Sequence, residues 1–181
     1  MILKTDRLIL RHWRRWDAKE LHKYASNPKV GPNAGWPIHK NVGESRDIIK
    51  HVLAKPTTFA VVLKETKKPV GSAGLILGKD CHIDVPIDEA EIGYWIGEPY
   101  WGQGLIPEAV NKLLEYGFVN LGLGKIWCGY FEGNTKSKRV AEKCGFKYQY
   151  TKENVPCAIE GQLNIVHFAS ITKDDWLEGK K

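Results

Sequence analysis

The residues with the clearest capacity for chemistry form a glycine-rich segment near the middle of the chain, Trp101-Gly102-Gln103-Gly104, followed by Leu105-Ile106-Pro107. Glycine lets the backbone approach a ligand closely. The first N–H groups of a helix have no intrahelical partner and lie at the positive end of its dipole. The segment therefore predicts an anion site suited to phosphate, with Pro107 in the first turn and unable to donate. A plain strand-to-helix turn fits the same residues.

Three well-known phosphate loops do not match this sequence. A Walker loop needs Gly-Lys followed by Ser or Thr, whereas Gly124-Lys125 is followed by Ile126. A dinucleotide-binding fingerprint needs a third glycine where Pro107 stands. The companion motifs of a kinase loop are absent from the sequence. Any anion bound by the glycine segment is therefore held in another way.

A second motif, Asn134-Thr135-Lys136-Ser137, opens a short helix. The Asn134 side chain can accept a hydrogen bond from the backbone N–H of Ser137 as an N-cap, and Gly145 fits the position just after the helix. Helix capping alone explains this pattern. An additional role, in which Asn134 and Ser137 face a ligand bound at the glycine segment, remains open.

The elements that must position these motifs follow from hydrophobic patterning. Asp17 is expected to cap the first helix, and Gly122 and Gly124 to end the long one after Leu121. Polar residues 79–89, broken by Pro86, are expected to form a loop. The sequence predicts strands at residues 8–10, 59–64, 70–77, 91–96, 125–131, 146–150 and 163–171, and helices at residues 17–26, 45–53, 105–121 and 134–145. This order is that of a mixed α/β domain.

Composition excludes several classes of function. The net charge of +6 comes from scattered residues, and no nucleic-acid-binding module is recognisable, so direct nucleic-acid binding is not expected. No apolar run approaches the roughly 20 residues of a membrane span, and the N-terminus does not resemble a signal peptide, so a cytoplasmic protein is expected. The four cysteines form no Cys-x-x-Cys pair. We therefore expect neither a metal site nor disulfides.

The two motifs, in this order, resemble those of the GNAT acetyltransferases. Within this family the motifs resemble those of the ribosomal-protein N-terminal acetyltransferase subgroup, the RimJ/RimL type. The resemblance runs from Thr5 to Ile171, nearly the whole chain, and four motifs in the correct order are more specific than any one. They are Asp6-Arg7-Leu8-Ile9-Leu10-Arg11, Glu91-Ile92-Gly93-Tyr94-Trp95-Ile96, Gly102-Gln103-Gly104 with Glu108-Ala109, and Asn134-x-x-Ser137 with Lys143-x-Gly145-Phe146.

The resemblance implies a single domain over residues 1–181, of the α/β class, with a mixed, mostly antiparallel sheet flanked by helices, the GNAT or acyl-CoA N-acyltransferase fold. It implies acetyl-CoA as co-substrate and no metal. Backbone N–H groups of residues 102–106 are expected to bind the pyrophosphate, and the strand at residues 94–96 to lie beside the pantetheine arm. The cofactor-binding residues implied are Tyr94, Trp95, Ile96, Trp101, Gly102, Gln103, Gly104, Leu105, Ile106, Asn134 and Ser137.

The sequence departs from the family pattern at three positions. Trp101 stands where Arg or Gln often begins the loop, and Ile106 where Gly or Ala is common. Ala141 stands where many members carry a tyrosine acid, which leaves Ser137 as the candidate that assists the CoA thiolate, by donating a proton or by orienting water or the sulfur. Glu91 matches the strand glutamate that serves as base in parts of the superfamily; a solvated edge glutamate is the alternative.

The resemblance implies transfer of an acetyl group to an amine acceptor, above all a protein N-terminal α-amine such as that of a ribosomal protein. At pH 7 an α-amine with a pKa near 8 is neutral in about one molecule in ten, so a modest base suffices. The alternatives are acetylation of a small-molecule amine, such as a drug or polyamine, and a non-catalytic acyl-CoA-binding module. No membrane partner is expected, and a homodimer is left open. Candidates for lining the acceptor pocket, or for ordinary packing, are Trp36, His39, Tyr94 and Tyr130.

Overall fold

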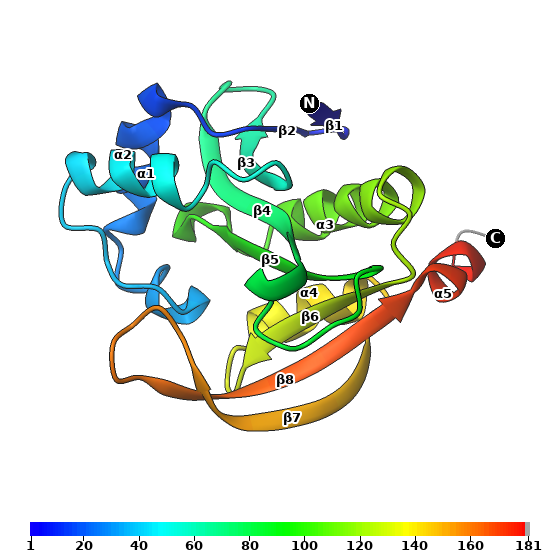
Figure 1. Cartoon of the computed structure of the whole chain (residues 1–181). Helices are drawn as coiled ribbons and strands as arrows, with labels where there is room; N and C mark the ends of the chain where they lie inside the picture. Colours follow the sequence, from blue (N-terminus) through cyan, green and yellow to red (C-terminus); the bar gives the residue numbers. More distant parts are fainter. Residues whose placement is uncertain (180–181) are drawn as a thin grey trace. The chain divides into compact units, whose positions relative to one another are not determined.

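The computed structural model describes residues 1–179 of the chain, and strands and helices are interspersed along it (Figure 1). The strands are β1 Ile2–Lys4, β2 Leu8–Arg11, β3 Thr58–Leu63, β4 Pro69–Leu77, β5 Glu89–Ile96, β6 Lys125–Phe131, β7 Lys147–Pro156 and β8 Leu163–Thr172. The helices are α1 Ala18–Ala25, α2 Val42–His51, α3 Leu105–Glu115, α4 Thr135–Lys143 and α5 Lys173–Glu178.

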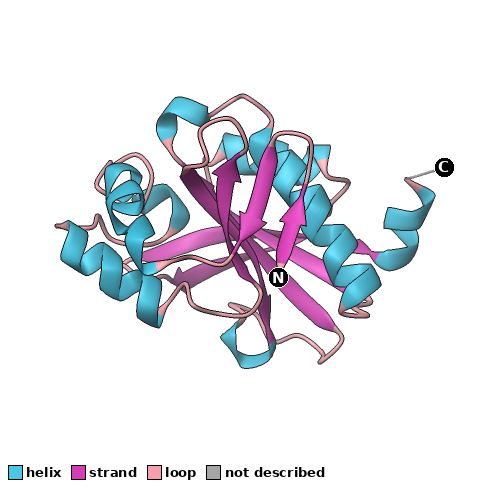
Figure 2. Ribbon diagram, turned by 90° about the horizontal axis from the view of Figure 1, so that it is seen from above, coloured by secondary structure: helices cyan, strands magenta, loops and turns pink. Residues whose placement is uncertain are grey.

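The strands form one mostly antiparallel sheet in the order β1-β2-β3-β4-β5-β6-β8-β7. Strands β5 and β6 pair in parallel, from Glu89 opposite Lys125 to Ile92 opposite Cys128. Helices flank the strands, as Figure 2 shows in cyan and magenta. The fold class predicted from the sequence is confirmed.

The chain divides into two compact units. The first unit contains Met1–Gly74 and Tyr94–Ala109, and the second contains Leu75–Gly93 and the chain from Val110 onward. A single domain over residues 1–181 stays a prediction.

The core of the first unit is built by α1, α2 and the inner faces of β2 and β3. Apolar residues at helical spacing, such as Leu21 and Ala25, give α1 one buried face. Helix α2 begins where the Asn41 side chain accepts a hydrogen bond from Glu44 N at 2.9 Å. The buried residues of this cluster are Trp13, Ala18, Leu21, Ala25, Ile49, Ala60 and Val62.

Asp17 does not cap α1 with its side chain, so this sequence prediction was wrong. The carboxylate accepts hydrogen bonds from Arg11 Nη1 at 2.7 Å, Arg11 Nη2 at 2.9 Å and the backbone N–H of Arg14 at 2.9 Å. A guanidinium that donates two parallel bonds to a carboxylate is a stronger partner than one backbone N–H. The buried Asp17 therefore serves the ion pair with Arg11 and a short 3₁₀ turn, Arg15–Asp17, that precedes α1.

The core of the second unit lies against the long pair of β7 and β8, drawn in orange and red in Figure 1. In β6 the side chains alternate, so that Ile126, Cys128 and Tyr130 are buried on one face while Trp127 and Phe131 point the other way. The second face packs on a cluster of Ile83, Val155, Val166 and Phe168. This cluster fixes the loop at residues 81–88 over β6 and β8.

The long predicted helix ends in an unexpected way. Regular α3 stops at Glu115, and one π-helical turn, Tyr116–Asn120, follows. The wider turn changes the direction in which later side chains point, so Phe118 is fully buried while Leu121 is 37% exposed. The prediction of one regular helix running to Leu121 was therefore wrong. The chain does leave the helix at Gly122, whose φ is 72°.

Two further elements were missed, and one was too short in the prediction. Strand β1 has only three residues and an exposed Ile2, so it carries no pattern. Helix α5 has six residues and starts where Thr172 Oγ1 accepts from Asp175 N at 3.1 Å. Strand β7 runs to Pro156 because it pairs with β8 through two register shifts, between Tyr148 and Tyr150 and between Lys152 and Val155.

Candidate active site

The glycine segment forms a turn that enters α3 in the first unit. Gly102 and Gly104 have φ values of 75° and 74°, a left-handed conformation that glycine adopts without a steric cost. A Cβ on Gly102 would meet no atom within 4 Å, and on Gly104 the nearest atom would be Arg7 Nη2 at 3.6 Å. Backbone conformation therefore requires these glycines, and the space beside them is open.

Side chains of the segment hold the turn in place. Trp101 Nε1 donates to the carbonyl of Ile96 at 2.9 Å, and Gln103 Nε2 donates to the carbonyl of Pro99 at 2.8 Å. Both bonds tie the turn to the chain just before it. The structure thus gives Trp101 and Gln103 a structural task, and their predicted contact with the cofactor stays a prediction.

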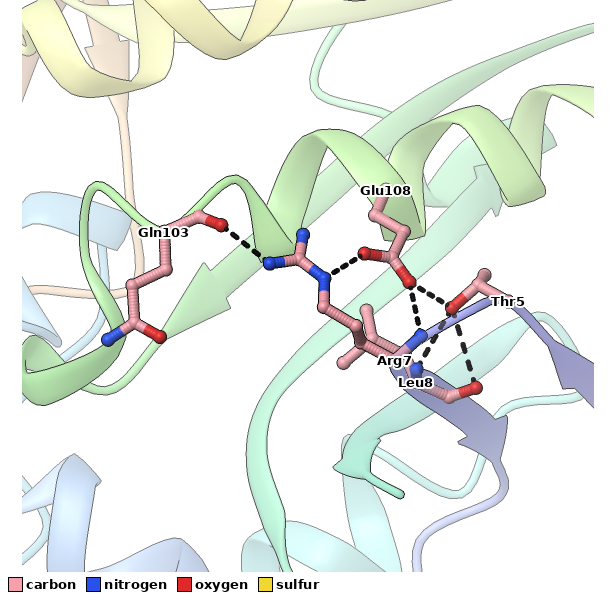
Figure 3. A network of polar contacts seen from close by, with 5 residues as sticks. All are labelled: Thr5, Arg7, Leu8, Gln103 and Glu108. Atoms are coloured by element: carbon pink, nitrogen blue, oxygen red, sulfur yellow. Dashed lines mark hydrogen bonds and ion pairs between the residues drawn. The ribbon is translucent and has the colours of Figure 1, made fainter. Parts of the chain in front are cut away.

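An ion-pair network in the first unit fixes the first turn of α3 (Figure 3). Arg7 Nε donates to Glu108 Oε2 at 2.6 Å, Arg7 Nη1 donates to the Gln103 carbonyl at 2.9 Å, and Arg7 N donates to Glu108 Oε1 at 2.8 Å. Thr5 Oγ1 donates to the same carboxylate. Burial alone would raise the pKa of Glu108, but hydrogen bonds from Thr5 and Arg7 outweigh it and lower the pKa.

The sequence did not assign a role to Arg7 or Glu108. Both residues belong to motifs that carry the family resemblance, and this membership was the one available signal. In the structure they connect the residue just before β2 to the first turn of α3. The first N–H groups of this helix are the ones predicted to bind phosphate. Because the charges of Arg7 and Glu108 compensate each other, the positive end of the helix dipole stays available to another anion.

Residues 94–96, predicted to line the pantetheine arm, continue β5 beyond its pairing with β6, which ends at Ile92. The Trp95 ring stacks on Trp13, with centroids 6.3 Å apart, and meets the edge of Trp36 at 5.6 Å. Ile96 is buried. The Ile96 side chain and the half-buried Trp95 ring thus take part in packing, and the predicted contact of residues 94–96 with the cofactor stays a prediction.

Glu91 lies in the second unit and is 5% exposed. Its carboxylate accepts hydrogen bonds from His82 N at 2.8 Å and from His82 Nδ1 at 3.0 Å. The alternative of a solvated edge glutamate is therefore wrong. The hydrogen bond to Glu91 raises the pKa of His82 above its usual value, against the opposing effect of burial. His82 was missed from the sequence because it lies in a loop without a pattern.

The predicted cap of α4 is confirmed in the second unit. Asn134 Oδ1 accepts a hydrogen bond from Ser137 N at 3.1 Å, and Gly145, with a φ of 83°, follows the helix end. Ser137 is half-buried. The structure therefore brings Asn134 and Ser137 together, and their role toward a ligand stays a prediction.

A pocket of about 380 Å³ adjoins the start of α4 in the second unit. A chain of hydrogen bonds joins four of its lining residues: Tyr148 Oη to Thr151 Oγ1 at 2.9 Å, Thr151 Oγ1 to His167 Nδ1 at 2.7 Å, and His167 Nε2 to Glu132. Of the candidate acceptor-pocket residues, Tyr130 lines this pocket, whereas Trp36 packs on His39 in the first unit. The lining also includes Phe131, Gly133, Asn134, Thr135 and Lys138.

Two features of residues 1–179 concern metal binding and membranes. No group of three or more His, Cys, Asp or Glu side chains in this part of the chain could hold a metal ion. No helix among the same residues has the length and apolar character needed to cross a membrane. The cysteines at positions 81, 128, 144 and 157 are not joined in disulfides within the described residues.

Comparison with known proteins gives one consistent result. The model of the acetyltransferase (GNAT) domain matches residues 7–147. The chain is 31% identical to the uncharacterized N-acetyltransferase p20 of Bacillus licheniformis, over 96% of this chain and 97% of that protein. It is 28% identical to the [ribosomal protein uS5]-alanine N-acetyltransferase of Escherichia coli, over 49% of this chain and 45% of that protein.

Among solved structures, a GNAT-family acetyltransferase from Bacillus anthracis superposes with a TM-score of 0.82 at 22% identity, covering 96% of this chain and 99% of that one. At this identity the likeness shows the fold. The family match and the p20 relative both span most of the sequence. The chain therefore belongs to the GNAT family and is an N-acetyltransferase whose fold uses acetyl-CoA as acetyl donor.

Proposed function

We propose that this enzyme acetylates protein N-terminal α-amines, and that a ribosomal protein is its acceptor. The observation that carries the proposal is the left-handed glycine turn at the start of α3, fixed by the Arg7–Glu108 ion pair. Support for the acceptor comes from the Escherichia coli relative, whose name gives a ribosomal protein as its target. Such an acceptor would place the enzyme in the cytoplasm.

In this proposal the N–H groups of residues 102–106 bind the pyrophosphate of acetyl-CoA. The open space beside Gly102 and Gly104 and the positive end of the α3 dipole suit a phosphate there. Backbone N–H groups at residues 94–96 bind pantetheine, and one of them stabilises the negative charge that develops on the acetyl oxygen. The cofactor supplies an acetyl thioester, which an amine can attack directly.

The second unit supplies the groups that handle protons. The negative charge of Glu91 draws the proton away from the attacking amine, and Ser137 assists departure of the CoA thiolate. A serine hydroxyl is a weak acid, so Ser137 acts either by donating a proton or by orienting a water or the sulfur. Asn134 holds the backbone of this turn through its cap.

The test is an acceptor panel with release of free CoA as readout. The panel contains a lysine-free peptide with a free N-terminus, a lysine-containing peptide with a blocked N-terminus, and a polyamine. We expect turnover of the first peptide, with mass spectrometry placing the acetyl group on its α-amine. Turnover of the polyamine alone would replace the proposed acceptor, and the absence of turnover with acetyl-CoA bound would indicate a non-catalytic binding module.

A further inference from the structure

Glu91, the residue predicted to act as the base, accepts hydrogen bonds from a histidine, His82. Glu91 is 5% exposed, and Oε2 accepts from His82 N at 2.8 Å while Oε1 and Oε2 lie 3.0 Å and 3.1 Å from His82 Nδ1. An added Cβ on Gly129 of β6 would stand 3.5 Å from Glu91 Oε1, which shows how closely the strand covers the other side. An amine therefore cannot reach Glu91 as easily as it can reach the partner of Glu91.

That partner is accessible. The side chain of His82 is 54% exposed, against 7% for that of Glu91. An ionised carboxylate can only accept, so its contact with Nδ1 requires Nδ1 to carry the hydrogen, and the neutral ring then has its lone pair on Nε2. Across residues 1–179 the structure records no hydrogen bond to His82 Nε2. The ring is thus held in the tautomer that a base requires.

We propose that His82, oriented by Glu91, is the group that accepts the proton of the acceptor amine. The inference rests on the proposed function, in which an amine attacks the acetyl thioester. The nitrogen forms a bond to the acetyl carbon, the C–S bond breaks, the N–H proton passes to His82 Nε2, and the sulfur leaves as thiolate. Glu91 stays ionised and stabilises the imidazolium, which makes it a positioning residue.

The groups around the pair are consistent with this charge distribution. From β7, Tyr150 faces Glu91, and burial together with the negative charge of Glu91 raises its pKa. In the loop, Cys81 is affected in the same way, by burial first and by the charges of Glu91 and Asp80 after that. His82 is the group in this cluster whose protonation neutralises Glu91, and its pKa is raised by that contact.

The raised pKa sets the expected pH dependence. His82 is protonated below its folded-state pKa and cannot accept a proton there, so kcat should rise with pH through a value above 6.5. In Glu91→Gln the amide can still occupy the site but lacks the negative charge. The pKa of His82 should therefore fall, and the rise in kcat should move to lower pH. If Glu91 itself were the base, a His82 variant would show the same rise in kcat with pH.

The experiment compares His82→Gln, Glu91→Gln and the control His51→Gln, which changes an exposed histidine of α2. For His82→Gln we expect about a hundredfold loss of kcat with the α-amine peptide. The rise in kcat with pH should disappear, and the Kd for acetyl-CoA should stay within twofold of wild type. Nitrogen NMR of wild-type enzyme should show neutral His82 protonated at Nδ1, independently of turnover. The control should match wild type in every measurement.

The outcomes separate the two claims. Wild-type turnover together with an unchanged pH profile in His82→Gln, or a neutral ring protonated at Nε2, would overturn the role of His82 and leave the proposed function standing. A wild-type enzyme that releases no CoA with any acceptor would overturn the proposed function, and the role of His82 with it.

Discussion

Arg7 and Glu108 lie 101 residues apart in the sequence and form an ion pair with 2.6 Å between Nε and Oε2. The pair connects the residue just before β2 to the first turn of α3. Arg7 also donates to the carbonyl of Gln103, inside the glycine turn. One side chain thus fixes both the turn and the helix that together are proposed to bind pyrophosphate.

Lowering the pH should reveal how much the Arg7–Glu108 pair contributes to folding stability. Glu108 has a lowered pKa in the folded state, so its stabilisation is present above the unfolded-state value of about 4.3 and is lost as pH falls through the folded-state pKa. We expect Glu108→Gln to lower stability by about 1 kcal/mol at pH 7 and by less at pH 3. Thermal unfolding from pH 3 to 7 measures this, and parallel curves for the two proteins would contradict it.

Acetyl-CoA should stabilise the folded enzyme. A ligand that binds only the native state contributes about 2.7 kcal/mol at a concentration of 100 times its Kd, which for a chain of this size is a rise in Tm of roughly 5–10 °C. A thermal shift assay with acetyl-CoA and with CoA checks this. No shift at millimolar acetyl-CoA would remove the cofactor assignment.

Gly104→Val should weaken acetyl-CoA binding more than it weakens folding. The control is Gly161→Val in the β7–β8 loop, because both glycines have a φ of 74° and neither has a close neighbour that a Cβ would strike. Each variant should lose about 1–2 kcal/mol of stability from the left-handed conformation. Only Gly104→Val should lose tenfold or more in affinity by calorimetry. Equal affinities in the two variants would reduce the segment to a turn.

Asn134 and Ser137 should separate into a structural and a catalytic residue. Asn134→Ala loses the side-chain cap, at a cost of about 1 kcal/mol in unfolding free energy. Ser137→Ala keeps the backbone N–H that the cap needs, and alanine is the better helix former. Its stability and acetyl-CoA affinity should match wild type while kcat falls about tenfold or more. Wild-type turnover in Ser137→Ala would leave solvent as the proton source for the thiolate.

The buried cysteines should resist modification in the folded state. Burial raises the pKa of Cys144 to about 12, and Cys128 is fully buried, so neither provides a reactive thiolate near neutral pH. Titration with a thiol reagent at pH 8 should modify these two residues only after denaturant is added. Peptide mapping identifies which thiols react, and rapid labelling of Cys144 without denaturant would contradict the expectation.

The elements that the sequence predicted well are those with a local cause. The bounds of β6 follow from alternation over seven residues, and the start of α4 follows from one Asn and the N–H three residues later. The contacts that were missed are not local. His82 meets Glu91 only because the loop folds back onto β5, and Arg7 meets Glu108 only because β2 is placed beside α3 by the tertiary fold.

The Glu91 prediction illustrates the same limit within the site. Family resemblance identified the carboxylate, but no sequence pattern reports that its side chain is buried or that a histidine nine residues earlier covers it. Burial decides which of the two groups meets a substrate. The charged residue could therefore be identified from the sequence, while its burial and its histidine partner required the structure.

Strand β7 stands at one end of the strand order, so one of its backbone edges has no neighbour in the sheet. Open edges invite other chains to add a strand. Here the edge carries Lys147, Lys152 and Glu153, two register shifts, a left-handed Asn154 and a terminal Pro156. Charge, irregular backbone and a missing N–H each oppose further pairing. Two molecules are therefore not expected to pair along the β7 edge.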